Sequence, residues 1–253
     1  MSTVKTVFTS KTVKIEDKVV ANEIKEILSK KHLMTPLEYN IALMNTSVFK
    51  NRFANGNPPV CWLERINSEE VLTTNDVSVD MFKEYVHELS QYIDGNELIY
   101  AGKTICSDFY VDEHGDVYEP GITYIREESA KDIYNTPNVV YLQKVTIDNI
   151  GYWIKVGKTT QEFKKRQQQY SSLGKMTKSN YGSITEQLMK NLLRVGYEIE
   201  WYALKIPTLD SIEVAGSKLK RIYPISVEDI EQWFKDIIKA KFNKRFVENI
   251  KIK

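Results

Sequence analysis

Side chains that commonly bind metals or act as nucleophiles are scarce in this chain. Its 253 residues include two cysteines, Cys61 and Cys106, and three histidines, none of them after position 114. Two widely spaced cysteines provide neither a disulfide framework nor a zinc site by themselves, and they are typical of a reducing compartment. The C-terminal half therefore has no imidazole that could serve as a general base or a metal ligand.

Long apolar runs are also missing. No stretch of about 18 apolar residues occurs, so the sequence predicts no transmembrane helix. The first residues, MSTVKTVFTSKTVKIEDK, lack the apolar segment of a signal peptide. We therefore expect a cytoplasmic protein with no membrane partner, large enough for one domain or two small ones.

The net charge of +1 hides an uneven distribution along the chain. Residues 1–65 contain 10 Lys and Arg against 6 Asp and Glu, residues 66–137 contain 4 against 16, and residues 138–253 contain 21 against 12. A basic segment favours phosphate polymers through charge neutralisation and counterion release. A lysine-rich solvated surface would give the same composition, so charge alone makes nucleic acid only a candidate partner.

The N-terminal part reads as a mixed α/β domain over residues 1–137. Two short helices, at 21–32 and 35–44, precede a basic segment, and together they allow a helix-turn-helix at 21–59, a pattern that is also common by chance. Apolar spacing predicts a further helix at 79–93. Residues 97–120 read as strands with a turn at DEHGD.

The pattern changes after a connector at 126–138, where we place a domain boundary. Residues 138–253 predict a small α+β unit that opens with a β-hairpin. Its elements are expected to be strands at 138–147 and 152–157, a helix at 160–173 capped by Thr160, a helix at 183–196 that ends at Gly196, a strand at 197–207, and helices at 208–223 and 226–242.

Gly-Lys-Thr occurs twice, in YAGKT at 100–104 and in KVGKT at 155–159. A nucleotide-binding P-loop needs another glycine five residues before the glycine of Gly-Lys-Thr. Glu97 and Tyr152 occupy that position, so neither copy predicts ATP or GTP binding. We interpret YAGKT as a strand-to-turn sequence, since no basic residue follows it until Arg126.

The second copy leads directly into a helix that carries an arginine. Phe163, Arg166, Tyr170 and Leu173 are spaced 3, 4 and 3 residues apart and share one helical face. Phe163 and Leu173 mark this face as inward. An arginine there is costly unless it meets a ligand phosphate or an internal carboxylate, or extends past its neighbours to solvent.

The segment VVYLQKV…YWIKVGKTTQEFKKRQQQY resembles the core of the GIY-YIG nuclease superfamily. Val139-Val140-Tyr141 stands where Gly-Ile-Tyr would, and Lys155-Val156-Gly157 stands where Tyr-Ile-Gly would, in the Lys-Val-Gly form of some phage and restriction-type members. Arg166 lies nine residues after Gly157, at the place of the family arginine. The resemblance covers about residues 138–236 and implies a three-stranded antiparallel sheet flanked by helices.

The resemblance also implies roles for individual residues. Tyr141 would be the general base, assisted by Lys155, because a tyrosine with an ordinary pKa near 10 needs a nearby cation to ionise. Arg166 would bind the scissile phosphate, for which its planar fork is suited. Tyr170, one turn further on, would bond to the nucleophile or the phosphate. Without the resemblance, a tyrosine in an apolar strand such as VVYL is usually a core residue.

Glu213 is the expected metal ligand, since the family glutamate lies on the helix after the third strand. Mg²⁺, or Mn²⁺ in its place, takes oxygen ligands and keeps several waters, so one carboxylate can suffice. Asp210 and Glu213 also have the spacing of a capping box, and Glu198 and Glu200 are rival ligands on the strand itself.

These observations lead us to expect a Mg²⁺-dependent endonuclease acting on double-stranded DNA in a bacterial cell, of phage, homing or restriction type. Residues 1–137 would select the target, and a palindromic target would imply a homodimer. The alternative is a sequence-specific DNA-binding protein that derives from a nuclease but does not itself cleave DNA. The residues expected to contact DNA are Lys50, Arg52, Lys158 and Lys165.

Overall fold

The computed structural model describes most of the chain's predicted elements. Predictions about Lys50, Arg52 and Tyr170 lie outside the described residues. The described residues are 5–9, 11–46, 79–90, 97–119, 121–147, 151–169, 192–193, 196–206, 211–214, 217–220 and 226–241.

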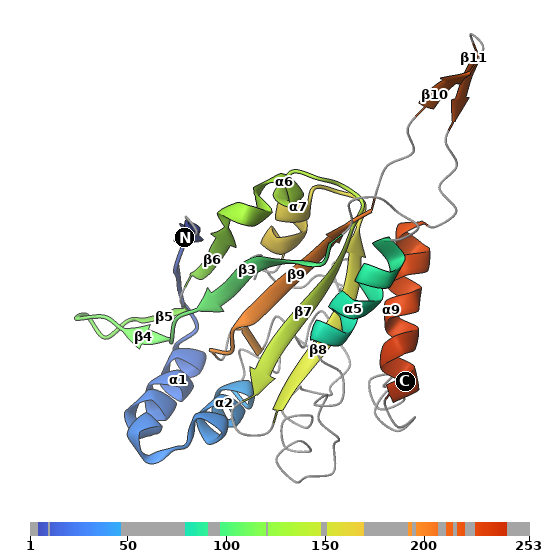
Figure 1. Cartoon of the computed structure of the whole chain (residues 1–253). Coiled ribbons are helices and arrows are strands. Elements are labelled where there is room, and N and C mark those ends of the chain that lie inside the picture. The colour runs from blue at the N-terminus through green and yellow to red at the C-terminus, as the bar shows by residue number, and fades with distance from the viewer. Residues whose placement is uncertain are drawn as a thin grey trace.

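A six-stranded sheet forms the centre of the molecule, in the order β1-β6-β3-β9-β7-β8 (Figure 1). Every neighbouring pair of strands in it is antiparallel. Together with the helices on its two faces, it confirms the expected α+β class. The strands are β1 (Lys5–Thr9), β3 (Ile99–Cys106), β6 (Ile122–Glu127), β7 (Val139–Ile147), β8 (Gly151–Thr159) and β9 (Ile199–Lys205).

This sheet runs across the boundary expected between residues 1–137 and 138–253. Strand β3 pairs with β9, which in turn pairs with β7, and buried residues from both segments form one hydrophobic cluster. The three strands expected for the C-terminal unit are adjacent, in the order β9-β7-β8. They are not a separate sheet, because β3 pairs with the edge of β9 that a three-stranded sheet would leave open.

YAGKT lies inside β3 and not at the strand-to-turn junction that we expected. The β3–β9 register shifts between Tyr100 and Gly102, where the strand bulges. Gly102 has a φ of 113° and approaches β6 so closely that a Cβ there would lie 2.0 Å from the carbonyl oxygen of Ile125. Lys103 forms an ion pair with Glu198 at 2.7 Å. The glycine of this copy is therefore needed for strand packing.

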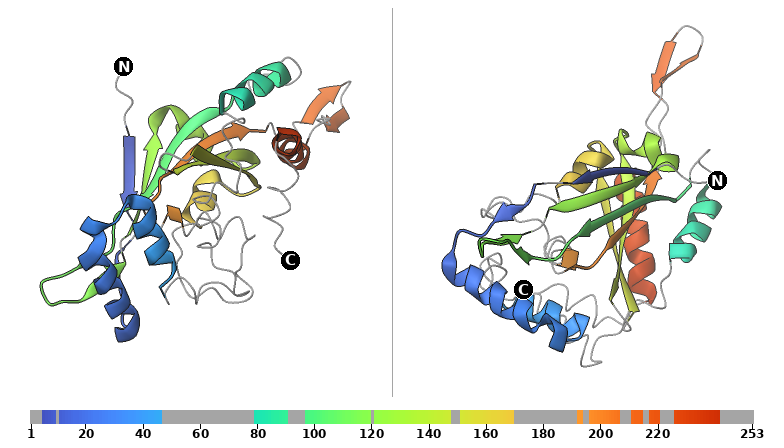
Figure 2. Two further views of the ribbon diagram at one scale, coloured as in Figure 1. Left: turned by 90° about the horizontal axis from the view of Figure 1, so that it is seen from below. Right: turned by 90° about the vertical axis from the view of Figure 1, so that its left-hand side faces the viewer.

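Helices cover both faces of the sheet (Figure 2). Helix α7 (Phe163–Gln168) lies on one face, and α5 (Val79–Ser90) and α9 (Val227–Lys241) lie on the other. The rings of Phe82 in α5 and Phe234 in α9 meet edge to face at 5.1 Å. The helices expected at 79–93 and 226–242 are thus confirmed over these two ranges.

The helices expected near the N-terminus are also confirmed, as α1 (Lys18–Lys30) and α2 (Pro36–Met44), joined by the 3₁₀ turn η1 (Lys31–Leu33). Thr35 and Glu38 form a capping box at the start of α2. The basic segment after α2 lies outside the described residues, so the helix-turn-helix remains a prediction. A small sheet of β2 (Val13–Lys14), β5 (Val117–Glu119) and β4 (Tyr110–Val111) lies beside α1, with the expected turn at 112–116 between β4 and β5.

Two expected helices differ in the structure. Helix α7 begins at Phe163, and Thr160 does not cap it; the preceding turn is held by the Thr159 hydroxyl, which accepts a bond from the Gln161 amide at 3.1 Å. Residues 211–220 contain a hairpin of β10 (Ser211–Val214) and β11 (Ser217–Lys220) in place of a helix. Gly216 weakens a helix here, and Ser-Ile-Glu-Val alternates as a strand does.

Two smaller expectations can also be compared with the structure. Gly196 has a φ of 103°, and its N–H donates to the carbonyl oxygen of Leu193 at 3.2 Å, as expected for a helix-ending glycine. The connector at 126–138 is ordered: after β6 it forms the 3₁₀ turn η3 (Glu128–Ala130) and the short helix α6 (Lys131–Tyr134). Within the described part of the chain, no helix has the length and apolar character needed to cross a membrane.

Candidate active site

The candidate site lies on the face of the sheet that α7 covers. Residues directly opposite each other on paired strands share a face. The register therefore places on this face a row that crosses five strands, consisting of Arg126, Gly102, Trp201, Gln143 and Lys155. Tyr141, two residues before Gln143 on β7, points to the same face.

Tyr141 and Arg166 are in direct contact. The Arg166 Nε donates a hydrogen bond to the Tyr141 hydroxyl oxygen at 2.8 Å, and its Nη1 donates to Oε1 of Gln169. Tyr141 is fully buried and Arg166 is half-buried. A charged donor on a phenol oxygen favours the anionic form of that oxygen. The arginine expected on the inward helical face thus meets the tyrosine of the first strand.

Gly157 lies directly across from Tyr141 in the β7–β8 register. A Cβ at Gly157 would lie 2.5 Å from both Cζ and the hydroxyl oxygen of Tyr141. The tyrosine ring therefore crosses the strand over the glycine, where only a hydrogen atom fits. This contact gives a packing reason for the glycine of the second motif.

We expect Gly157→Ala to destabilise the fold by about 1–3 kcal/mol, the usual cost of an extra methyl in a packed core. The free energy of unfolding in urea measures it. Tyr141→Leu removes the ring that causes the clash, so adding Gly157→Ala to that variant should cost distinctly less. An equal cost in both backgrounds would mean that the Tyr141 ring is not the obstacle.

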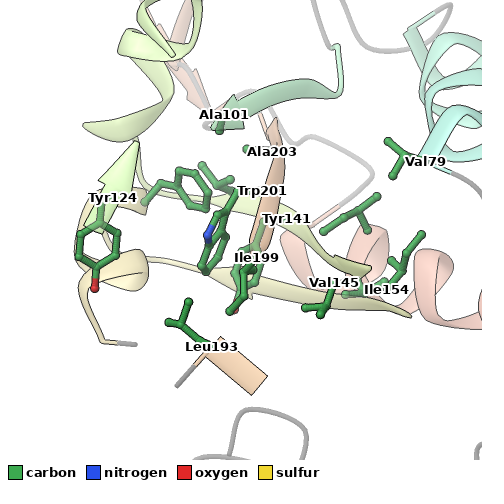
Figure 3. Packing of buried hydrophobic residues seen from close by; sticks show 14 of the residues in the cluster. Val79, Ala101, Tyr124, Tyr141, Val145, Ile154, Leu193, Ile199, Trp201 and Ala203 are labelled. Atoms are coloured by element: carbon green, nitrogen blue, oxygen red, sulfur yellow. The ribbon is translucent and has the colours of Figure 1, made fainter. Parts of the chain in front are cut away.

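Aromatic packing fixes the Tyr141 ring from the sides (Figure 3). Its centroid is 5.9 Å from that of Phe163 on α7 and 5.4 Å from that of Trp201 on β9. The Trp201 indole N–H donates to the Thr104 hydroxyl at 2.8 Å, so its one polar group is satisfied within the core. The position of the hydroxyl of Tyr141 is therefore set by three elements of the fold.

Lys155 is a buried cation in the same row, with 8% of its surface exposed. It lies opposite the fully buried Gln143, two pairs along the ladder from Tyr141 and Gly157 and therefore in the next pair on that face. Burial of an ammonium group is costly and is found mainly where the charge has a use or a partner. Sequence reasoning missed Gln143; its only signal was a polar residue within the apolar strand VVYLQKV.

The expected DNA-contacting lysines lie elsewhere. Lys158 alternates to the opposite face of the sheet from Gly157, where its ammonium group bonds to Glu228 of α9 and lies 3.9 Å from Glu231. Lys165 is exposed on α7 and forms an ion pair with Glu162 at 3.4 Å. The structure therefore does not bring Lys158 to Tyr141, and a DNA contact by Lys165 remains a prediction.

The expected metal ligand is not assembled with this site. Glu213 lies in the β10–β11 hairpin, which projects away from the central sheet (Figure 1), and its side chain lies outside the described residues. The two alternative metal ligands form ion pairs, Glu198 with Lys103 and Glu200 with Lys144 at 3.0 Å. Within the described ranges no three His, Cys, Asp or Glu residues cluster in a way that could hold a metal ion. A Mg²⁺ site built on a single carboxylate, as the resemblance implies, stays a prediction.

Comparisons with known proteins give one distant structural similarity. No family model matches the chain, and no curated protein matches it. Among solved structures, the chain is similar to the restriction endonuclease HPY188I in complex with product DNA, with 16% identity, a TM-score of 0.31, and coverage of 68% of this chain and 93% of that one. A TM-score of 0.31 does not establish a shared fold, so function is inferred below from side-chain geometry.

Proposed function

We propose that the chain is an endonuclease that hydrolyses phosphodiester bonds of double-stranded DNA. The observation that carries this proposal is the hydrogen bond of 2.8 Å from Arg166 Nε to the Tyr141 hydroxyl, formed over Gly157. It places a cation suited to phosphate beside an oxygen suited to proton transfer.

Arg166 is the phosphate-binding group in this proposal. Its guanidinium is held by Tyr141 and Gln169, so its orientation is set before substrate binds. A pre-oriented cation aimed at a phosphate stabilises the charge that develops on the oxygens during hydrolysis, and it does so at little reorganisation cost. The net charge of +9 in residues 138–253 favours approach of a nucleic acid to this part of the chain.

Tyr141 is the proton acceptor in this proposal. Hydrolysis needs a base to take a proton from the attacking water, and no histidine follows position 114. The Arg166 donor bond and a cation at Lys155 would favour an anionic phenol oxygen, whereas the complete burial of Tyr141 opposes it. Transfer to Tyr141 gives a phenol and a hydroxide-like nucleophile at the phosphorus, and the leaving sugar oxygen takes up a proton.

The proposal also includes a requirement for Mg²⁺ or Mn²⁺ with Glu213 as a ligand, target selection by residues 1–137, and a homodimer on palindromic sites. The complete burial of Tyr141 favours a second candidate function, DNA binding without catalysis, because a buried hydroxyl reaches water only after local movement.

Tyr141→Phe is expected to reduce nicking and linearisation of plasmid DNA at least 100-fold, the usual contribution of a general base. The variant removes one oxygen atom and leaves the half-buried Arg166 Nε without its acceptor, so we expect a folded protein that is less stable by about 1–3 kcal/mol. The assay runs with Mg²⁺, with Mn²⁺ and with EDTA, and Tyr110→Phe serves as control because Tyr110 is exposed in β4.

Two results would count against the nuclease assignment. Wild-type protein that binds DNA tightly in low salt but cuts none with either metal would favour the binding protein. Tyr141→Phe that cuts at the wild-type rate would remove Tyr141 from the chemistry.

A further inference from the structure

A second arginine on the same face of the sheet is buried without a carboxylate partner. Arg126 of β6 is 8% exposed, and among the described residues no carboxylate lies within ion-pair distance of it. Its Nε donates to Oε1 of Gln167 at 3.3 Å, and its Nη2 is buried with no hydrogen-bond partner. Burial lowers the pKa of this guanidinium. A buried charge of this kind is costly until an anion approaches it.

Two aromatic rings lie close to this guanidinium. Its Cζ lies 4.9 Å from the ring centroid of Phe8 in β1 and 4.9 Å from that of Tyr134 in α6. Tyr134 is buried, whereas Phe8 is 50% exposed. Phe8 therefore offers solvent an aromatic surface beside a cation, an arrangement on which nucleic-acid bases stack.

A pocket of about 470 Å³ opens at this arginine, a size suited to one small ligand. Lys131 and Lys164 add two cations to its wall. Glu127 and Glu128 add two carboxylates, of which Glu128 is paired with Lys131 at 3.1 Å. The remaining lining residues are Phe8, Tyr134, Asn135 and Gln168.

We propose that this pocket binds a nucleotide, with the phosphate against Arg126, Lys131 and Lys164 and the base against Phe8. Lys131 and Lys164 are ion-paired with Glu128 at 3.1 Å and Glu162 at 3.2 Å, so among the described residues Arg126 is the cation of this wall that has no carboxylate partner. The Asn135 amide, whose Oδ1 accepts from the Lys164 ammonium group at 2.6 Å, and the Gln168 amide line the pocket where the edge of a base would lie. A phosphate ion could bind the lysines, but it has no ring to stack on the exposed face of Phe8.

The position of the pocket indicates which nucleotide it receives, and this step rests on the proposed nuclease function. Two successive residues of α7 link the candidate active site to the pocket: Arg166 bonds to Tyr141, and Gln167 bonds to Arg126. Strands β6 and β7 are three strand spacings apart, about 14 Å. A strand with one phosphate at Arg166 reaches the pocket within a few nucleotides. The pocket would therefore hold a nucleotide of the same strand outside the cleaved bond.

Calorimetric titration with dAMP, dTMP and inorganic phosphate tests the site in metal-free buffer, where no cleavage can interfere. We expect saturable binding of a mononucleotide, weaker binding of phosphate, and at least tenfold loss of affinity in Arg126→Met. Phe8→Ala and the double variant Lys131→Ala/Lys164→Ala change exposed or half-exposed side chains and should each weaken binding severalfold even if Arg126→Met folds poorly. Lys83→Ala, an exposed lysine of α5 on the opposite face of the sheet, is the matched control.

The results separate this inference from the nuclease proposal. Mononucleotide binding that is lost with Phe8→Ala supports the site even if no DNA is ever cut. An accompanying rise in KM for oligonucleotide cleavage would assign the site to the substrate strand, whereas an unchanged KM would assign it to a free nucleotide. No mononucleotide binding at 10 mM ligand, on the order of the weakest useful affinity, or equal binding in all pocket variants, would overturn the inference while leaving the nuclease proposal intact.

Discussion

Arg166→Ala is expected to lower the rate of DNA cleavage about 1,000-fold, the upper range for removal of one pre-oriented donor to a developing negative charge. The guanidinium bridges the Tyr141 hydroxyl and Gln169, so its loss removes the phosphate-binding cation and the charged donor to the proposed base together. Single-turnover cleavage of a plasmid or an end-labelled duplex measures the loss. Because one change affects both groups, Tyr141→Phe should reduce the rate much less in the Arg166→Ala background than in wild type.

Two matched variants sharpen this prediction. Arg166→Lys retains the positive charge but not the planar fork, and we expect it to restore only a small part of the rate. Lys83→Ala removes an exposed cation of α5 on the other face of the sheet, ion-paired with Asp80 at 3.1 Å, and should change cleavage by less than about threefold, the scale of an exposed ion pair. If Arg166→Ala folds and cuts DNA as fast as Lys83→Ala, Arg166 has no part in the reaction.

Gly102→Ala is expected to have the largest effect on stability, a loss of about 4 kcal/mol or more. A Cβ there would lie 2.0 Å from the backbone oxygen of Ile125 and 3.0 Å from Cα of Arg126, at a φ of 113° that L-amino acids rarely adopt. Backbone cannot turn aside as a flexible side chain can, so β3 and β6 must separate at this point. Urea unfolding of the purified variant, or its failure to accumulate as folded protein, measures the effect.

Gly115→Ala is the control for the conformational part of this effect. Gly115 also has a positive φ, 79°, but a Cβ there would meet only the Lys25 Nζ at 3.8 Å. Its cost should be about 1–2 kcal/mol, that of the left-handed backbone alone. Equal losses at the two glycines would show that the close approach of β3 to β6 does not limit stability.

The local elements of the chain could be predicted well where one strong signal controlled them. Thr35, Pro36 and Glu38 give a start signal for α2, and the apolar spacing of 226–242 gives α9. The β7–β8 hairpin followed from two short strand patterns separated by a turn sequence. Prediction was wrong for 211–220, where a helix was expected over 208–223 and the structure has a hairpin.

Within the candidate site, the meeting of Tyr141 and Arg166 was partly predictable. The inward face of α7 required a partner for the arginine, and the resemblance pointed to the strand that carries Tyr141. The spacing of residues gave no indication that Gly157 makes room for the Tyr141 ring, because that contact depends on the register of β7 against β8. Lys158 and Lys155 are three residues apart, yet the alternation of a strand sends them to opposite faces.

By itself, the sequence determined the charge distribution, the secondary structure of most described segments, and the small set of residues able to handle a phosphate. Only the tertiary structure decided that the segments before and after residue 137 share one sheet, that YAGKT lies within a strand, and that Arg126 lies buried beside a pocket. The reason is the range of the interactions involved. Helix caps and apolar spacing act over a few residues, whereas the pairing of β3 with β9 joins residues about a hundred positions apart, and no local pattern records which strand edge meets which.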